Sequence, residues 1–196
     1  VVERAKAAGA VIWGKTNVPY LAGDWQSDNR VFGQSANPFD KEKTPGGSSG
    51  GAAGALAAGF TPLEIGSDIG GSLRIPAHFC GVTSLKPSFG VIPQEGHVPP
   101  SPEYAATVDL NVVGPMARCV RDLKLLRSVI MAGSTLGQSS PTLSVKGLKL
   151  AVWTEPEAWP ISHVIKGAVE AAGEELLSSG AEVTSAKPDI DPEELI

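Results

Sequence analysis

Two clusters of glycine and serine, Gly46–Gly51 and Gly66–Ser72, contain the residue types in this sequence that are best suited to chemistry. A run of glycines directly before a helix lets consecutive backbone N–H groups point into one small space. The start of the helix adds unpaired N–H groups and a partial positive charge. Such a turn binds either an oxyanion or a phosphate, and Ser72 at its end would lie within reach of a carbonyl held there.

A serine hydroxyl of ordinary pKa is a poor nucleophile, so Ser72 needs a base that takes its proton. The three histidines are weak candidates for this base. His78 follows Ser72 on the expected helix and points about 120° away from it at 3.6 residues per turn. His97 lies in a Pro/Gly-rich loop, and His163 begins a distant helix. We therefore expect the proton to be relayed through another group, for which Ser48 is the best candidate.

Other catalytic and binding motifs are missing or lack their structural context. Nothing approaches the H-E-x-x-H spacing of zinc hydrolases, so we expect neither a metal nor an organic cofactor. The phosphate-loop and dinucleotide fingerprints are also missing. Gly46–Gly50 fits the G-x-S-x-G nucleophile elbow, but that elbow follows a hydrophobic strand, and residues 41–45 read Lys-Glu-Lys-Thr-Pro.

The stretch from Gly46 to Pro87 resembles the amidase signature family, whose members hydrolyse amides with a Ser–cis-Ser–Lys triad. Gly46–Gly51 matches the Gly-Gly-Ser-Ser-Gly-Gly block of that family, and Gly66–Ala77 matches its second block. The 24-residue step from Ser48 to Ser72 matches as well. Further family-like segments extend the resemblance over nearly all of residues 5–185: Gly14–Asn17, Asn37–Pro38, Phe79–Gly81, Leu85–Pro87, Gly114–Arg118, Asp122–Leu123 and Gly147–Lys149.

This resemblance implies a role for each matched position. Ser72 is the nucleophile that becomes acylated, and Ser48 is the bridging serine, held by a cis peptide bond, that relays the proton. The oxyanion hole consists of backbone N–H groups, those of Ile69, Gly70, Gly71 and Ser72. Three side chains support the two loops: Ser49, Asp68 and Arg74. Gly47 and Trp25 are candidates for substrate binding, although an aromatic residue in a loop is at least as often there for packing.

The lysine of the triad is the one departure from the family pattern. In the family it lies several dozen residues before the first glycine block, ahead of Val1. Lys15 matches a different position, a structural turn, and Lys86 belongs to the Leu-Lys-Pro segment. We therefore expect this chain, which begins without Met, to be the catalytic middle of a longer enzyme and to be inactive by itself.

The pattern of expected elements indicates an α/β fold, a mixed sheet with parallel members flanked by helices. Helices are expected over 1–8, 50–59, the segment after Ser72, 118–132 and 164–179. Strands are expected over 11–13, 63–66, 148–153 and from 181. Residues 15–47 and 90–115 are expected to be irregular because they are rich in Asn, Gly, Pro and Ser. We treat residues 1–196 as one partial amidase domain.

Composition limits the partners and the location. A net charge of -5 with scattered Lys and Arg argues against nucleic acid, and no apolar run is long enough to cross a membrane. Cys80 and Cys119 suit buried thiols, which favours a reducing, cytoplasmic setting. The expected partner is a small-molecule amide substrate, and association into a homo-oligomer stays open.

Two alternatives to a free-standing bacterial-type amidase remain. One is an amidotransferase component that releases ammonia from glutamine for tRNA-dependent transamidation. The other is a relative without activity that is kept for binding, against which the intact Ser48 and Ser72 argue. The segments Asp24–Asn29 and Gly96–Pro100 favour the free-standing amidase. The sequence does not identify the amide that is cleaved.

Overall fold

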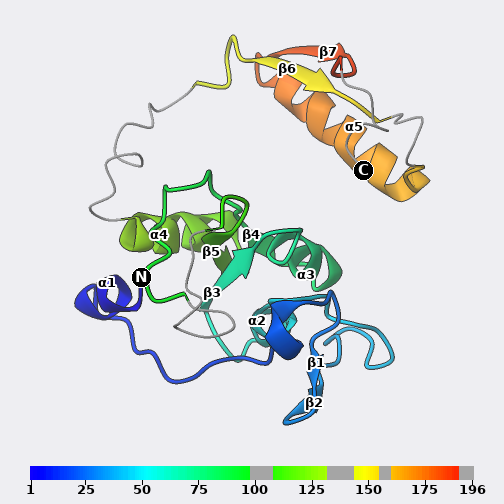
Figure 1. Ribbon diagram of the computed structural model, residues 1–196. Coiled ribbons are helices and arrows are strands. Elements are labelled where there is room, and N and C mark those ends of the chain that lie inside the picture. The colour runs from blue at the N-terminus through cyan, green and yellow to red at the C-terminus, as the bar shows by residue number, and fades with distance from the viewer. Residues whose placement is uncertain (98–107, 132–143, 155–159, 190–196) are drawn as a thin grey trace. The chain divides into compact units, whose positions relative to one another are not determined.

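The computed structural model describes residues 1–97, 108–131, 144–154 and 160–189. The chain divides into two compact units, Val1–Ser140 and Pro141–Ile196, and each unit is described by itself. Both combine helices and strands, which confirms the expected α/β class (Figure 1).

The first unit is built on a three-stranded antiparallel sheet of order β3-β5-β4. The strands are β3 (Leu63–Asp68), β4 (Thr83–Ser84) and β5 (Val112–Ala117). The register places Asp68 opposite Val112 at the end of β3 where the candidate nucleophile loop begins. All six residues of β5 are buried. The sheet therefore provides a rigid base for the loop that carries Ser72.

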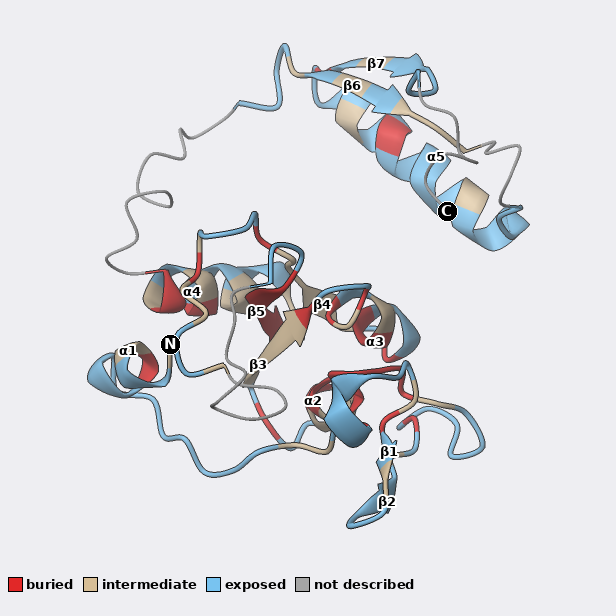
Figure 2. Ribbon diagram, in the orientation of Figure 1, coloured by how far each residue is buried: buried red, intermediate tan, exposed pale blue. Residues whose placement is uncertain are grey.

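Helices α2 (Gly50–Ala57) and α3 (Arg74–Phe79) pack together beside this sheet. Small side chains on α2 allow close packing, which outweighs the poor helix propensity of its glycines. One buried cluster joins α2 and α3 to β5: Ala52, Ala53, Leu56, Leu73, Ala77, Cys80 and Met116. In Figure 2 the buried residues, coloured red, are concentrated where α2, α3 and β5 meet. Both candidate serine loops lead directly into this core.

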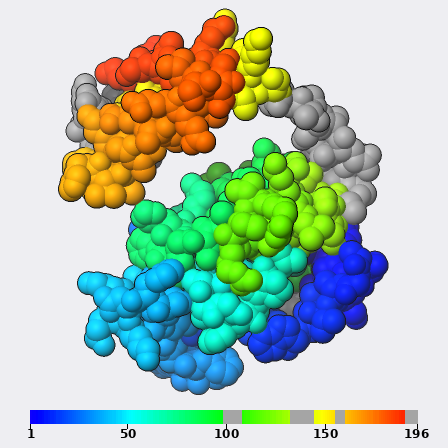
Figure 3. Space-filling model, turned by 180° about the vertical axis from the view of Figure 1, so that it is seen from behind, coloured from blue at the N-terminus to red at the C-terminus, as the bar shows by residue number. Residues whose placement is uncertain are grey.

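Helix α4 (Val120–Ile130) packs with β5 and with the short helix α1 (Val2–Ala7). The helix expected over 118–132 is confirmed; Leu126 and Ile130 on it are buried, whereas Val120 at the first turn is 54% exposed. Arg4 donates to the carbonyl oxygen of Ile130 over 2.8 Å and joins the two helix ends. The space-filling view shows the cyan-to-green segments of the first unit packed against one another (Figure 3).

The segment between α1 and α2 is largely irregular, as expected. It contains a single 3-10 turn, η1 (Tyr20–Ala22), and a hairpin of the two-residue strands β1 (Asp28–Asn29) and β2 (Gly33–Gln34). The prediction of a strand at Val11–Trp13 is wrong: these residues form no strand, and Val11 is 85% exposed. A strand needs a neighbour for its backbone groups, and none of the described residues pairs with this run.

The second unit consists of a parallel pair of strands and one helix. Strand β6 (Lys149–Val152) pairs with β7 (Glu182–Ser185), and α5 (His163–Ser178) connects and packs against them. Gly173 is the buried residue of α5, and a Cβ there would lie 2.9 Å from Val152. The elements expected over 148–153, over 164–179 and from 181 are confirmed. Strand β6 alternates between exposed and half-buried residues, because only one of its faces packs on the helix.

Two details of the sheets differ from the sequence prediction. The parallel pair lies in the second unit, and the described strands of the first unit are all antiparallel. Strand β5 occupies part of the segment 90–115 that we expected to be irregular, and its Gly114-Pro115 pair is unusual inside a strand. Pro115 lacks an N–H, yet its carbonyl accepts from Leu85. Among the described residues, no helix has the length and apolar character needed to span a bilayer.

Candidate active site

The loop Gly46–Ser49 leads from the irregular segment into α2 and carries the first two candidate serines. The Gly47–Ser48 peptide bond is cis, as the resemblance implied. Both Ser48 and Ser49 are buried, with 4% and 6% of their surface exposed. The loop is therefore fully packed rather than a solvent-exposed turn.

Hydrogen bonds of Ser49 join this loop to the second glycine cluster. Its N–H donates to the carbonyl oxygen of Ser72 over 3.2 Å. Its hydroxyl contacts both backbone groups of Ser67, accepting from the N–H and lying 3.4 Å from the carbonyl oxygen. Segments far apart in sequence are thus held side by side, which places Ser48 and Ser72 on adjoining stretches of backbone.

Asp68, at the end of β3, organises the turn that follows. Its side chain is fully buried, and Oδ1 accepts from the N–H of Gly71 over 2.8 Å. Oδ2 accepts from the N–H of Leu73 over 3.1 Å. Arg74 also binds this carboxylate: its Nε donates to Oδ2 and its Nη2 donates to Oδ1, each over 3.0 Å. The carboxylate therefore fixes the backbone on both sides of Ser72.

The ionisation of Asp68 follows from this arrangement. Burial opposes its charge and would raise the pKa, but the hydrogen bonds from Arg74, Gly71 and Leu73 outweigh burial and bring the pKa below its usual value. The same contact raises the pKa of the Arg74 guanidinium. At neutral pH the site thus contains a buried carboxylate and a half-exposed cation.

The N–H groups before Ser72 are not equivalent. The N–H of Gly71 donates to Asp68 and is therefore not available for an oxyanion, although we expected all four N–H groups to be available. Among the described residues, no hydrogen bond is formed by the N–H groups of Ile69, Gly70 or Ser72. Ile69 and Gly70 are also exposed. Three donors at this turn thus remain available for a ligand.

Ser72 lies just before α3, in the turn that starts the helix rather than inside it. The first helical hydrogen bond runs from the Ile75 N–H to the Gly71 carbonyl over 2.7 Å. Gly71 has a φ of +114°, which an L-residue rarely adopts. The side chain of Ser72 is half-buried. This location agrees with the expected place of Ser72 at the end of a glycine turn that opens a helix.

Trp25 and Gly47, the residues predicted to contact substrate, are neighbours in the structure. A Cβ on Gly47 would lie 2.5 Å from the Asp24 carbonyl oxygen and 2.9 Å from the Trp25 Cα, so only glycine fits against this backbone. Trp25 is 58% exposed. The Trp25 side chain is therefore largely accessible on a loop that touches the Gly47–Ser48 turn.

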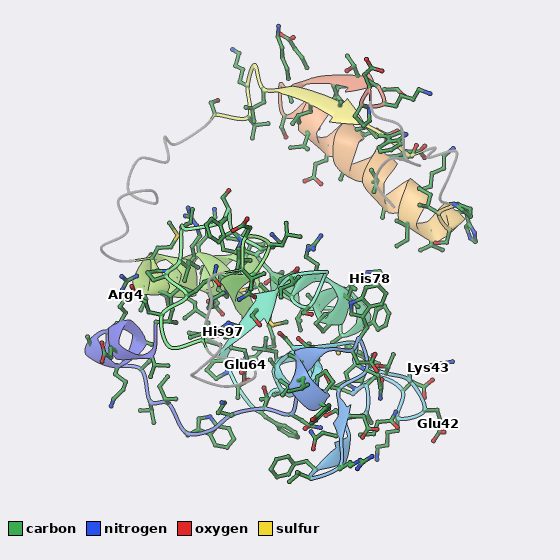
Figure 4. The ribbon with its side chains drawn as sticks, in the orientation of Figure 1. Arg4, Glu42, Lys43, Glu64, His78 and His97 are labelled. Atoms are coloured by element: carbon green, nitrogen blue, oxygen red, sulfur yellow. The ribbon has the colours of Figure 1, made fainter. Side chains whose placement is uncertain are left out.

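Among the described residues, no histidine forms a hydrogen bond to Ser72. His78 is exposed on α3, beside Phe79 at a ring-centroid distance of 5.8 Å (Figure 4). Nδ1 of His97 is paired with the amide of Asn111 over 3.1 Å, and burial together with Lys15 lowers the His97 pKa. His163 begins α5 in the second unit.

No set of three His, Cys, Asp or Glu side chains in the described part of the chain is arranged to hold a metal ion. Nor does Lys15 or Lys86 hydrogen-bond to a candidate serine among the described residues.

Sequence reasoning missed two polar residues that hold the first loop. Ser27 is fully buried, and its hydroxyl contacts backbone groups of the Gly46–Gly50 loop. The carbonyl of Asn17 accepts from the N–H of Gly51 over 3.2 Å, and its side chain donates to Ser27 and Ser35. Asn17 lies in a family-like segment, but the sequence assigns it no role. Nothing in the pattern around Ser27 indicates a buried hydroxyl.

The profile of the Amidase family matches residues 1–194, and the chain belongs to that family. Curated relatives include the A-type component of the glutamyl-tRNA(Gln) amidotransferase of Methanococcoides burtonii, 42% identical over 78% of this chain and 33% of that protein. The protein of the same name from Roseiflexus castenholzii is 39% identical over 93% of this chain and 38% of its own length. The chain thus spans about a third of the length of these relatives.

Solved structures also share this fold. A 6-aminohexanoate cyclic dimer hydrolase complexed with substrate aligns with a TM-score of 0.81 at 30% identity, over 96% of this chain and 41% of that chain. Fatty acid amide hydrolase aligns with a TM-score of 0.82 at 27% identity, over 96% and 35%. The A-type component of the glutamyl-tRNA(Gln) amidotransferase of Thermotoga maritima aligns with a TM-score of 0.77 at 32% identity, over 95% and 42%.

Proposed function

We propose that the protein containing this chain hydrolyses a carboxylic amide through an acyl-enzyme formed on Ser72. The observation that supports this most strongly is the junction of the two loops. There the Ser49 N–H is bonded to the Ser72 carbonyl, beside three N–H groups that have no partner among the described residues. A carbonyl bound at that turn would find both a nucleophile and hydrogen-bond donors. The site thus has the two features that acyl transfer to serine requires.

In this reaction the Ser72 Oγ forms a bond to the carbonyl carbon while its proton passes through the Ser48 hydroxyl to a base. The negative oxygen is met by the N–H groups of Ile69, Gly70 and Ser72, each typically worth about 3 kcal/mol in the transition state. The tetrahedral intermediate then collapses and its C–N bond breaks. The leaving ammonia or amine takes the proton from the base. Water then attacks the ester on Ser72, releases the acid and restores the hydroxyl.

Asp68, Arg74 and Ser49 act through the backbone in this proposal. Asp68 takes the N–H of Gly71, which leaves that group out of the oxyanion hole and fixes the turn instead. Ser49 holds the relay loop against the nucleophile loop. Trp25, exposed beside Gly47, is the side chain that we propose contacts the substrate. The base, by resemblance a lysine, is expected outside residues 1–196.

The test is to treat the complete protein with a fluorophosphonate and to locate the adduct by mass spectrometry. We expect labelling of Ser72 and complete loss of labelling and amide hydrolysis in Ser72→Ala. Ser48→Ala should slow both by about 10³-fold or more, because members of a catalytic set act as a unit. Ser178→Ala, on an exposed surface of α5, is the matched control and should behave as wild type. An adduct on Ser48 with Ser72 unmodified would refute the assignment.

A second candidate function is that of one component of an amidotransferase complex. Its specific support is the name shared by the curated relatives described above. The free-standing amidase is supported by the segment Asp24–Asn29, while most of Gly96–Pro100 lies outside the described residues. Assays of glutamine against simple aryl or alkyl amides distinguish the two. Release of ammonia only from glutamine, and only with a co-purifying partner chain, would favour the amidotransferase. Size-exclusion chromatography of the purified protein would test for a homo-oligomer.

A further inference from the structure

The hydroxyl of Ser27 contacts the candidate relay loop on both sides of Ser48. It donates to the carbonyl oxygen of Gly46 over 3.0 Å and lies 3.5 Å from that of Ser48. It also accepts from the N–H of Gly50 over 3.1 Å. No surface of Ser27 is exposed to solvent. One buried hydroxyl thus satisfies a carbonyl before Ser48 and the first amide of α2 after it.

These bonds form one of two supports for the loop. On one side, Ser49 is joined to the nucleophile segment through Ser67 and Ser72. On the other side, Ser27 and the Asn17 carbonyl take the consecutive N–H groups of Gly50 and Gly51. Ser48 lies between these supports. Its position relative to Ser72 is therefore set by contacts from two separate parts of the chain.

Only a small side chain that both donates and accepts satisfies this location. Alanine would leave the Gly50 N–H and the Gly46 carbonyl without their partner in a place where water has no access. The loop would then shift to recover hydrogen bonds. A proton relay works at heavy-atom separations of about 2.6–3.2 Å, so even a small shift of the Ser48 backbone would lengthen the relay.

We propose that Ser27 is a positioning residue of the catalytic apparatus, which holds the Gly46–Gly50 turn so that the Ser48 hydroxyl meets Ser72 at relay distance. This inference rests on the proposed function of Ser48 and Ser72. Among the described residues, the Ser27 hydroxyl bonds to backbone atoms of this turn and not to the hydroxyl of Ser48 or Ser72, so we infer that it acts through the loop.

The experiment compares Ser27→Ala, Ser27→Cys and Ser35→Ala in the complete protein, with hydrolysis of a small aryl amide expressed per folded molecule. Ser35 is in the same segment and accepts from Asn17, but among the described residues its hydroxyl does not touch the Gly46–Gly50 turn. For Ser27→Ala we expect kcat to fall about 10- to 100-fold, with KM within about twofold and an equal fall in the rate of fluorophosphonate labelling of Ser72. Ser35→Ala should retain kcat within about twofold.

Ser27→Cys keeps a weak donor and a weak acceptor on a somewhat larger atom, so its kcat should fall between those of wild type and Ser27→Ala. This variant provides the comparison if Ser27→Ala does not fold. The inference is overturned if the folded Ser27 variants turn over within about threefold of wild type, whatever their stability. Ser72→Ala, measured in parallel, separates the two proposals: an active Ser72→Ala refutes the acyl-enzyme itself, whereas an inactive Ser72→Ala beside fully active Ser27 variants refutes only the positioning function.

Discussion

The Asp68 carboxylate accepts the N–H of Gly71 over 2.8 Å, and this bond ties the end of β3 to the turn on which Ser72 lies. Asp68 was expected only to support the loops. Its bond to Gly71 takes up one of the four N–H groups of the expected oxyanion hole. The same bond locks the backbone conformation that presents the other three.

Replacing Asp68 with Asn tests this support. The amide keeps the size but offers one acceptor oxygen to donors on Gly71, Leu73 and Arg74, so we expect a loss of about 1–3 kcal/mol in the free energy of unfolding. Denaturant titration measures this loss. Asp109→Asn, at an exposed position without a hydrogen bond to the described residues, is the control and should change it by less than about 0.5 kcal/mol.

The stability difference between wild type and Asp68→Asn should depend on pH. The folded pKa of Asp68 is below its usual value, so ionised Asp68 stabilises the fold above the unfolded pKa of about 3.9. That stabilisation is lost as the pH falls through the lower folded pKa. The stability difference between wild type and Asp68→Asn should therefore be constant near pH 7 and shrink below about pH 4. A difference that grows in acid would contradict the buried carboxylate.

Two neighbouring glycines should respond differently to alanine. At Gly71 the φ of +114° predicts a loss of about 1–3 kcal/mol in stability, to which displacement of the Ile75 Cδ1, 2.5 Å from the added Cβ, adds little. At Gly70 no atom lies within 4 Å of the added Cβ and φ is not positive, so stability should change by less than about 1 kcal/mol. Thermal unfolding of both variants measures the contrast. Equal losses would mean that the turn does not have this conformation in solution.

The two cysteines should differ in reactivity. Burial raises the pKa of the Cys80 thiol to about 11, which leaves about one thiolate in a thousand at pH 8. Its Sγ also contacts the Pro45 carbonyl inside the core. Cys119 is half-buried at the start of α4. Iodoacetamide followed by peptide mass spectrometry should find Cys119 modified first in the native protein, with Cys80 reacting only after denaturation.

Residues 1–196 by themselves should not hydrolyse amides at a useful rate. Neither Lys15 nor Lys86 is hydrogen-bonded to Ser48 or Ser72 among the described residues, and removing the base from such a set typically costs about 10⁴-fold. The measurement is hydrolysis of a small aryl amide by this chain beside the complete protein. A rate within about tenfold would show that the base lies inside this chain.

The sequence alone determined the family and the candidate serines, because the family blocks are local. Gly46–Gly51 and Gly66–Ala77 each specify a turn and the start of a helix through residues adjacent in the chain, so Ser48 and Ser72 could be proposed as candidates without coordinates. The helices expected over 50–59 and 118–132 are confirmed as α2 and α4, because each is specified by residues close together in the chain.

Only the tertiary structure determined which N–H groups are free and which side chains hold the loops. The Asp68 bond to Gly71 depends on a side-chain direction, and the Ser27 bonds join residues well separated in the chain, which no local pattern encodes. Strand β5 was missed because Gly114-Pro115 disfavours a strand, and it forms because its neighbours β3 and β4 supply the pairing. Val11–Trp13 shows the converse: apolar composition favours a strand, but without a pairing neighbour among the described residues it does not form one.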